Sequence, residues 1–470
     1  MRILASLTLA IVLCASAAVA ALLRSPVPAA DWISNPVASW QLAQGENPEP
    51  VNLVLPVSQP LSAMAQLGRQ IFFDTSLSAS GRLSCASCHS PDHSYGPPGG
   101  APAMFGGPAL TSQGVRAVPS LMYLSTQPNF SIGPDPGGDD EAPVPLPQLA
   151  ALGGKHKRVT KTAQDTAQSA ANLVPLGGLF WDGRANTLQT QAMGPLLSPF
   201  EMDGGSIQRV DAKLQAAPYA NGFVQLFGPA IFEQPNLAVA EALFAVVRFE
   251  IEDPSFHPYS SKYDAWLEGH ARLSAAEMRG YELFNDPAKG DCTACHLDQP
   301  TADGQPPLFT DHQFEALGVP RNPNLRVNAN PDYYDLGICG PYRTDLAKQT
   351  QYCGMFLTPT LRNAATRKAF FHNGVYHDLN HVLDFYDFSV ARPEKIYPRG
   401  ANGEVEAFND LPKQYWANID RADPPFNLQA GQTPPLTAAE EQDIIAFLKT
   451  LDDGYDKPVM LASVSGTATP

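Results

Sequence analysis

The sequence predicts a mainly α-helical protein whose two related halves are joined by long loops. Apolar residues recur at helical spacing in several stretches, whereas the apolar–polar alternation that is typical of strands is sparse. A pattern of one helix, one loop and a Cys-x-x-Cys-His motif occurs twice in the chain. The 45 prolines among 470 residues favour long ordered loops between the helices.

The first residues predict export of the protein. An apolar run occupies residues 3–21 and ends in small residues at 18–20, which is typical of a cleaved secretory signal. The run is also about as long as a membrane span, so residues 1–21 could instead remain as an anchor. Residues 22–58 are rich in proline and polar residues, and we expect them to form a lead-in segment.

The helix that precedes each motif indicates an internal duplication. Residues 61–73 and 273–284 both begin with Leu-Ser-Ala, and each carries a glycine seven residues after the leucine, Gly68 or Gly280. Because glycine has no side chain, it permits a close approach of a second helix or of a cofactor.

Each Cys-x-x-Cys-His motif predicts covalent attachment of a c-type haem. Two thiols at this spacing can form thioethers with the two vinyl groups of one porphyrin, and the adjacent histidine can then bind the iron. A zinc site would need further ligands nearby, and a thioredoxin-like redox pair would not need the histidine. The residues are Cys85, Cys88 and His89 in the first motif and Cys292, Cys295 and His296 in the second.

Helical spacing also marks the end of each predicted domain. Residues 235–250 and 437–451 are apolar at helical spacing, and the second stretch has acids at its start and a lysine near its end, as the helix dipole favours. We therefore expect one haem domain at 59–251 and another at 271–456. The other segments are a loop insertion at about 131–175, a linker at 252–270 and a flexible tail at 457–470.

The remaining cysteines predict one disulfide. Four of the seven cysteines belong to the haem motifs, and Cys14 lies in the apolar run at the start. In the oxidising compartment that export implies, we expect Cys339 and Cys353 to pair. Such a bridge would stabilise the fold by about 3 kcal/mol in the chain-entropy model. Two buried free thiols are the alternative.

The net charge of −16 argues against nucleic acid as a partner, because nucleic-acid binding requires a basic surface. An acidic protein can instead attract a basic redox partner. The composition, with 44% hydrophobic and 17% charged residues, is typical of a globular protein.

Trp181, Gln191 and Glu201 lie ten residues apart between the two motifs, in the segment FWDGRANTLQTQAMGPLLSPFEM. A tryptophan ring can carry charge between two cofactors. A carboxylate can move a proton from one peroxide oxygen to the other, while an amide orients the peroxide. We therefore consider these three residues candidates for catalysis.

Four segments of the chain together resemble the bacterial di-haem cytochrome c peroxidase family, including its MauG-type branch. The resemblance extends from about residue 60 to about residue 455. Its matching blocks are LGRQIFFDTSLSASGRLSCASCH, the segment that contains Trp181, LSAAEMRGYELFNDPAKGDCTACH and FLTPTLRNAATRKAFFHNGVYHDLNHVLDFY.

This resemblance implies two cytochrome c-like, mainly helical domains with one haem in each, and unequal roles for the two haems. The N-terminal haem would react with peroxide, and the C-terminal haem would pass electrons on. His89 and His296 match the proximal ligands. Trp181 matches the tryptophan between the haems, and Gln191 and Glu201 match the distal pair.

The resemblance leaves the sixth ligand of the second haem open. Ordinary peroxidases of the family place a methionine late in the block that begins TLRN, where this chain has Tyr386. A tyrosine at this place resembles MauG, and phenolate is a known haem ligand. We favour Tyr386, with Met355 as the alternative.

Two departures from the family pattern concern the first haem and calcium. Some members carry a histidine that caps the first iron until reduction, and the segment 113–124 has none at the matching place, although His156 offers an alternative. We expect an uncapped iron. The family's calcium is held partly by backbone carbonyls, for which Arg367 and Ala369 are the matches, but its asparagine ligand has no clear equivalent. Calcium is therefore left open.

The sequence as a whole predicts an exported, periplasmic di-haem peroxidase. It would reduce hydrogen peroxide at the N-terminal haem, with electrons from a small cytochrome c or a cupredoxin relayed through the C-terminal haem. One alternative is a MauG-like enzyme that oxidises a protein substrate through a high-valent di-haem state. The other is a di-haem electron carrier without peroxidase activity.

Overall fold

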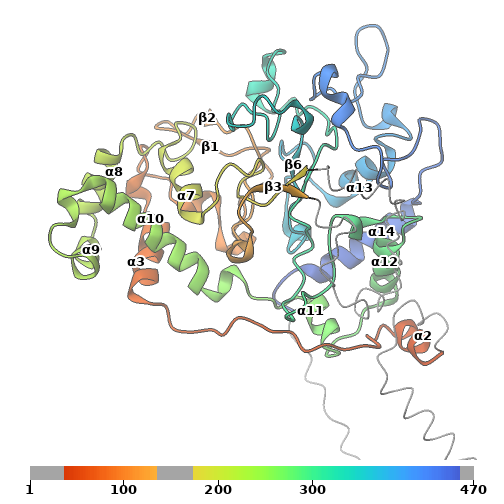
Figure 1. Cartoon of the computed structure of the whole chain (residues 1–470), viewed down its shortest axis with the longest axis horizontal. Coiled ribbons are helices and arrows are strands. Elements are labelled where there is room, and N and C mark those ends of the chain that lie inside the picture. Colours follow the sequence, from red (N-terminus) through yellow and green to blue (C-terminus); the bar gives the residue numbers. More distant parts are fainter. Residues whose placement is uncertain (1–35, 135–172, 456–470) are drawn as a thin grey trace, which may run out of the picture.

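A computed structural model describes residues 36–134 and 173–455, and this part of the chain is mainly helical, as predicted (Figure 1). Strand within these ranges is confined to three antiparallel pairs: β1 (Phe105–Gly106) with β2 (Ser112–Gln113), β3 (Ser131–Pro134) with β4 (Leu173–Leu176), and β5 (Phe314–Glu315) with β6 (Phe356–Leu357). The α-helices are α2 (Pro36–Ala43), α3 (Ala63–Phe72), α4 (Cys85–Cys88), α7 (Leu188–Leu197), α8 (Ile207–Ala216), α9 (Ala220–Phe227), α10 (Pro235–Glu252), α11 (Lys262–Leu267), α12 (Ala275–Asn285), α13 (Leu379–Phe388) and α14 (Ala438–Leu448).

The predicted duplication corresponds to two equivalent helix crossings in the structure. Helix α3 packs on α10, where a Cβ atom on Gly68 would lie 1.8 Å from the carbonyl oxygen of Ala245. Helix α12 packs on α14, where a Cβ atom on Gly280 would lie 1.9 Å from the carbonyl oxygen of Asp443. Only glycine allows the backbones to approach this closely. The repeated glycines therefore serve helix contact, one of the two roles that the sequence left open.

The repeated serines begin the two helices. Ser62 is the N-cap of α3, and its hydroxyl accepts a hydrogen bond from the backbone N–H of Ala65. Ser274 caps α12 in the same way, and Glu277 closes a capping box by accepting from the backbone N–H of Ser274. Each cap satisfies backbone donors that a helix start leaves unpaired, and so fixes where the helix begins.

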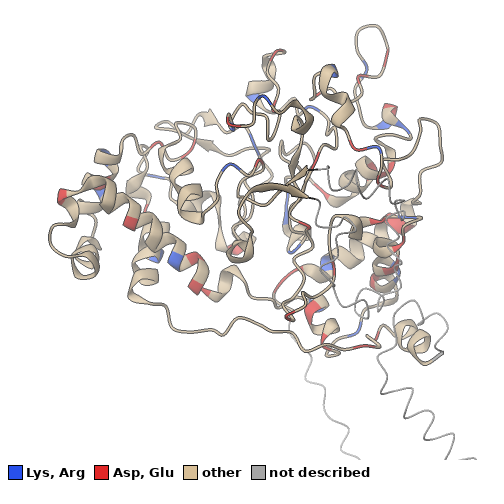
Figure 2. Ribbon diagram, in the orientation of Figure 1, with Lys and Arg blue, Asp and Glu red and all other residues tan. Residues whose placement is uncertain are grey.

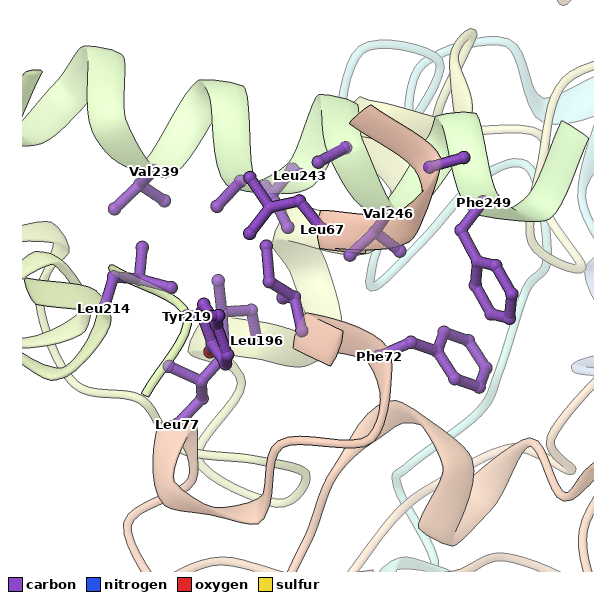
Figure 3. Close-up of a cluster of buried hydrophobic side chains, with 14 of the residues drawn as sticks. Leu67, Phe72, Leu77, Leu196, Leu214, Tyr219, Val239, Leu243, Val246 and Phe249 are labelled. Atoms are coloured by element: carbon purple, nitrogen blue, oxygen red, sulfur yellow. The ribbon is translucent and has the colours of Figure 1, made fainter. Parts of the chain in front are cut away.

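The first hydrophobic core lies between α3 and α10 and extends to α8 and α9. Figure 3 shows Leu67 and Phe72 of α3 beside Leu243, Val246 and Phe249 of α10. The Phe72 and Phe249 rings meet edge to face, with centroids 5.5 Å apart. Burial of each such side chain stabilises the fold by about 1.5–3 kcal/mol.

The second hydrophobic core joins α11, α12 and α14, with Tyr263, Trp266, Phe284 and Phe447 fully buried. Helix α11 lies inside the segment predicted as a linker, 252–270. Earlier in the same segment, Phe256 and Tyr259 belong to the first core, so the segment passes from one core to the other.

The lead-in segment packs against the second core, although it precedes the first core in sequence. The indole N–H of Trp266 donates to the carbonyl oxygen of Gly45 at 3.0 Å. The amide of Asn47 and the backbone N–H of Val51 both donate to the carbonyl oxygen of Leu267, at 3.1 and 2.9 Å. In Figure 1 the chain runs from α2, beside α12, across the molecule to α3.

Cys339 and Cys353 form a disulfide with their Cα atoms 4.9 Å apart. It borders a small cluster of buried side chains that includes Ile338 and Tyr352. The predicted signal or anchor, His156, most of the loop insertion and the tail lie outside the described residues. Within those residues, no helix is long and apolar enough to cross a membrane.

Replacement of Gly68 by alanine should destabilise the first core, because the added Cβ atom would collide with the backbone of α10. We expect a loss of about 1–3 kcal/mol in the free energy of unfolding, measured by chemical denaturation followed by circular dichroism. Gly222→Ala in α9 is the matched control, since its Cβ atom would meet only Leu67 Cδ1 at 3.5 Å. A similar loss in both variants would contradict the role of the crossing.

Candidate functional site

A large pocket contains the second Cys-x-x-Cys-His motif. It encloses about 1700 Å³ of space that opens to solvent, and Cys292, Cys295 and His296 form part of its wall. Apolar side chains of α14, Ile444 and Leu448, line the same pocket. A porphyrin is a ligand of the size and character that this pocket would accept.

Both motif histidines are held by a backbone carbonyl. Nδ1 of His89 lies 3.1 Å from the carbonyl oxygen of Tyr95, and Nδ1 of His296 lies 2.8 Å from that of Phe309. Burial lowers the pKa of each imidazole to about 4, so both rings are neutral at physiological pH. A neutral ring whose Nδ1 is bonded to a carbonyl presents Nε2 as a metal ligand.

The motif cysteines are free thiols that burial keeps protonated. Burial raises the pKa of Cys85 to about 12 and that of Cys88 to about 11. A zinc site would require thiolates, and no group of three or more His, Cys, Asp or Glu gathers as ligands in the ranges that the structure describes. An uncharged thioether suits these surroundings better than a metal-bound thiolate.

Glu201 lies beside the first motif. It occupies the turn after α7, where its carbonyl oxygen accepts from the backbone N–H of Gly107 at 2.8 Å. Its negative charge helps to raise the pKa of Cys88 after the larger effect of burial, so the carboxylate lies within electrostatic range of that sulfur. Part of the Glu201 residue is exposed to solvent, but burial of its carboxyl group raises the pKa of that group. The positive charge of Arg184 acts in the opposite direction and lowers this pKa.

Gln191 is buried on α7, one helix turn after the N-cap Thr187, whose hydroxyl accepts from the backbone N–H of Thr190. It lines a second cavity of about 1120 Å³. Neither Glu201 nor the residues of the first motif line this cavity, so the structure does not gather the whole predicted catalytic set in one pocket.

Trp181 lines both pockets and is one of the side chains in the wall between them. The other shared residues are Leu357, Thr358, Pro359, Leu361, Ala364, Phe370 and Phe371. Its indole N–H donates to the carbonyl oxygen of Ala117 at 2.8 Å, and its own carbonyl oxygen accepts from the backbone N–H of Leu357 at 2.9 Å. These bonds fix the position of the ring in the wall that the two pockets share.

A buried ionic network supports this tryptophan from the next residue, Asp182, which is fully buried. Arg116 donates to Asp182 at 2.7 Å and binds Asp335 through two hydrogen bonds of 2.6 and 2.7 Å. Arg184 also binds Asp182, at 2.8 Å. Burial alone would raise the pKa of Asp335, but the Arg116 guanidinium lowers it below its ordinary value.

The two residues predicted as alternative sixth ligands of a second haem, Tyr386 and Met355, lie in different places. Tyr386, on α13, lines the same pocket as Cys292, Cys295 and His296, whereas Met355 does not line it. Met355 packs instead with the small cluster beside the disulfide. Burial raises the pKa of the Tyr386 phenol, and the two cysteine sulfurs act in the same direction.

Several residues of the site carried little or no signal in the sequence. The Arg116–Asp335 pair joins positions 219 residues apart. His312 lines the second cavity with a buried Nδ1 that has no hydrogen-bond partner, and burial lowers its pKa to about 4. His372 stacks on Phe356 at 3.6 Å between ring centroids in the wall of the first-described pocket. For His372 the sequence does give a signal, because the block FFHNG lies in a segment that resembles the family and predicts this histidine as part of the second haem pocket.

Comparison with known proteins is consistent with this geometry. A profile of the di-haem cytochrome c peroxidase family matches residues 62–272. The methylamine utilization protein MauG of Paracoccus denitrificans (strain Pd 1222) is 30% identical over 409 residues, which cover 85% of this chain and 90% of MauG. Cytochrome c551 peroxidase of Nitrosomonas europaea is 26% identical, with 69% and 73% of the two chains covered.

The fold is also similar to that of a solved peroxidase. The di-haem peroxidase BthA from Burkholderia thailandensis E264 superposes with a TM-score of 0.70 at 32% identity, covering 86% of this chain and 89% of BthA. A BthA variant with methionine in place of a tyrosine superposes equally well, at 31% identity.

A protein with this fold and these motifs is a haem-dependent oxidoreductase. The chain belongs to the di-haem cytochrome c peroxidase family, which includes MauG. This membership argues against the alternative of an electron carrier without catalysis. Calcium stays a prediction that the structure does not test.

Replacement of Arg116 by glutamine should destabilise the centre of the molecule, because Asp182 and Asp335 would lose their shared cation. Removing one partner of a buried ion pair typically costs about 3–5 kcal/mol, and chemical denaturation would measure the loss. Arg279→Gln is the matched control, since Arg279 binds Asp443 through two hydrogen bonds at the exposed surface. There we expect a much smaller loss, because solvent screens the pair. Equal losses would argue against a special role for the buried network.

Proposed function

We propose that the protein is an exported di-haem c-type peroxidase. It reduces hydrogen peroxide at the first motif with electrons that pass through the second. The observation that carries this proposal is a carboxyl group with a raised pKa, Glu201, whose charge also helps to raise the pKa of Cys88 at the first attachment site. Family membership supports the reaction class.

The residues present fit two covalently bound haems. Cys85 and Cys88 would form thioethers to one haem, as would Cys292 and Cys295 to the other, and the protonated, unpaired state of all four thiols suits that bond. The neutral, carbonyl-bound rings of the two histidines would supply Nε2 to the iron. When bound, each haem supplies an iron that can exchange single electrons.

The protein would manage the proton of peroxide through two side chains. Glu201 would accept the proton from one peroxide oxygen and return it to the oxygen that leaves as water, since a raised pKa brings its carboxyl closer to the working pH. The Gln191 amide, buried on the helix that precedes Glu201, would orient the peroxide by hydrogen bonding. Trp181 would carry electrons between the two sites.

A MauG-like oxidase of a protein substrate is the second candidate. Two observations favour it: Tyr386 lines the second pocket, where Met355 does not, and MauG from Paracoccus denitrificans is 30% identical. In this proposal Tyr386 binds the second iron, and electrons come from side chains of the partner protein.

The proposed electron donor of the peroxidase is a small basic cytochrome c or cupredoxin. The chain as a whole carries a net charge of −16, and Figure 2 marks acidic residues in red on α12 and α14. Three of these acids, Glu277, Glu440 and Asp443, are paired with Lys262, Lys289 and Arg279, so the proposal rests on the net charge, which attracts a basic partner. The apolar run at residues 3–21 and the Cys339–Cys353 disulfide support export to the periplasm.

Replacement of Glu201 by glutamine should slow peroxide reduction by about two to four orders of magnitude, because the amide cannot accept the proton. In the native enzyme, activity should fall as the pH drops through the Glu201 pKa, which lies above its ordinary value, since protonation removes the base. Steady-state rates with a reduced cytochrome c would measure both effects. Glu241→Gln, on α10, is the control. Native-like turnover in Glu201→Gln would refute the proposed role.

Replacement of Tyr386 by phenylalanine should change the spectrum of the second haem and leave that of the first unchanged. The phenol that faces Cys292 and Cys295 would be lost, while the ring would still fill its place in the pocket wall. Optical and electron-paramagnetic-resonance spectra of the oxidised protein would detect the change of ligand. Met355→Leu should leave both spectra as they are. The reverse result would assign Met355 as the ligand.

A further inference from the structure

The two helix crossings define which residues of α10 and α14 are equivalent. Gly68 meets Ala245, and Gly280 meets Asp443, so Ala245 and Asp443 occupy the same position in the two units. The aromatic pairs agree with this register. Phe72 packs on Phe249 with centroids 5.5 Å apart, and the corresponding rings, Phe284 and Phe447, are 5.2 Å apart.

In this register Glu250 stands where the second unit has Leu448, five residues after each crossing point. Leu448 lines the pocket that contains Cys292 and His296, so this helix position faces the haem site. In the first unit, the Glu250 charge contributes to the raised pKa of Cys85. A carboxyl group therefore replaces an apolar side chain at the haem-facing position of the first unit only.

The Glu250 carboxyl is buried without a compensating charge. The residue is 7% exposed, and within the described ranges its side chain forms no hydrogen bond or ion pair. The titratable groups that face it are the Cys85 sulfur and the Tyr95 hydroxyl, and Arg69 and Asp253 face that hydroxyl in turn. The other ionic groups on elements packed against α10 are Arg209, Asp211, Lys213 and Glu233.

Burial raises the pKa of Glu250 to about 8. A carboxyl group in apolar surroundings resists ionisation, but a positive charge nearby offsets that cost. Haem iron gains one positive charge when it is oxidised. Because Coulomb interactions are strong where water is excluded, the ionisation of a carboxyl at this position depends on the oxidation state of the iron.

We propose that Glu250 is a positioning residue that couples a proton to the redox state of the first haem. When the iron takes up one electron, the Glu250 carboxylate takes up one proton from solvent. When the iron gives up the electron to its acceptor, the carboxyl releases the proton. The second haem lacks this coupling because Leu448 cannot ionise. The inference rests on haem attachment at Cys85 and Cys88, as proposed above.

Spectroelectrochemical titration of the intact di-haem protein between about pH 6 and pH 9, where a carboxyl of strongly raised pKa ionises, tests this coupling. The midpoint potential of the first haem should fall with rising pH, by at most about 59 mV for each tenfold drop in proton concentration, the one-electron limit. Glu250→Gln and Glu250→Leu should flatten this slope and raise the potential at alkaline pH. Leucine reproduces the side chain of the second unit, so this variant should fold.

Glu241→Gln is the control, since it removes a carboxyl group from the same helix, nine residues before Glu250. It should leave the slope unchanged, and the second haem should titrate alike in all variants. An unaltered slope in both Glu250 variants would overturn the proposal and assign the proton to another group. The midpoint potentials are measured at equilibrium and without peroxide. Their pH dependence can therefore be tested even if the proposed peroxidase activity is absent.

Discussion

Contact between two backbones, made possible by one glycine in each half, is the constraint on which the rest of this structure depends. At Gly68 and at Gly280 a helix lies so close to its partner that no side chain fits between them. This contact fixes the register of the helix pair, and the register decides which side chains face the adjacent Cys-x-x-Cys-His motif. The apolar packing around each crossing follows from it, as the matched aromatic pairs show. A shift by one residue would turn a different side of α10 or α14 toward the motif.

The two halves share this frame but differ in the side chains that fill it. In the second unit, the α14 residues that line the pocket of the second motif, Ile444 and Leu448, are apolar. The Tyr386 phenol on α13 lines the same pocket as the motif cysteines. The first unit has carboxyl groups whose charges act on its cysteines, the buried Glu250 on α10 and Glu201 after α7. Trp181 stands between the halves, held by an ionic network whose members come from distant parts of the chain. Duplication thus supplied two similar scaffolds, and a few substitutions gave them different chemistry.

Much of the fold could be predicted because its signals are local. The helical spacing at 235–250 corresponds to α10, and the Leu-Ser-Ala starts correspond to the caps of α3 and α12. Helix α11 was not predicted, because six residues are too few to show helical periodicity. The capping box formed by Ser261 and Asp264 could have indicated its start. The motif residues and Trp181 could be found by spacing and resemblance. The Arg116 network could not, since its partners meet only after the chain has folded.

The position of the lead-in segment sets the order in which the molecule can be completed. Asn47 hydrogen-bonds to Leu267 across 220 residues, so the earliest part of the described chain finds its binding site only when the second core exists. Closing so large a loop carries an entropic cost, and topologies with many contacts between distant parts of the chain fold slowly. A chain that emerges from its amino end must therefore keep this segment unpaired until more than half of the polypeptide has appeared. A cut after α10 would therefore remove the lead-in segment from the second core. That core would be incomplete, although every residue of α11, α12 and α14 would still be present.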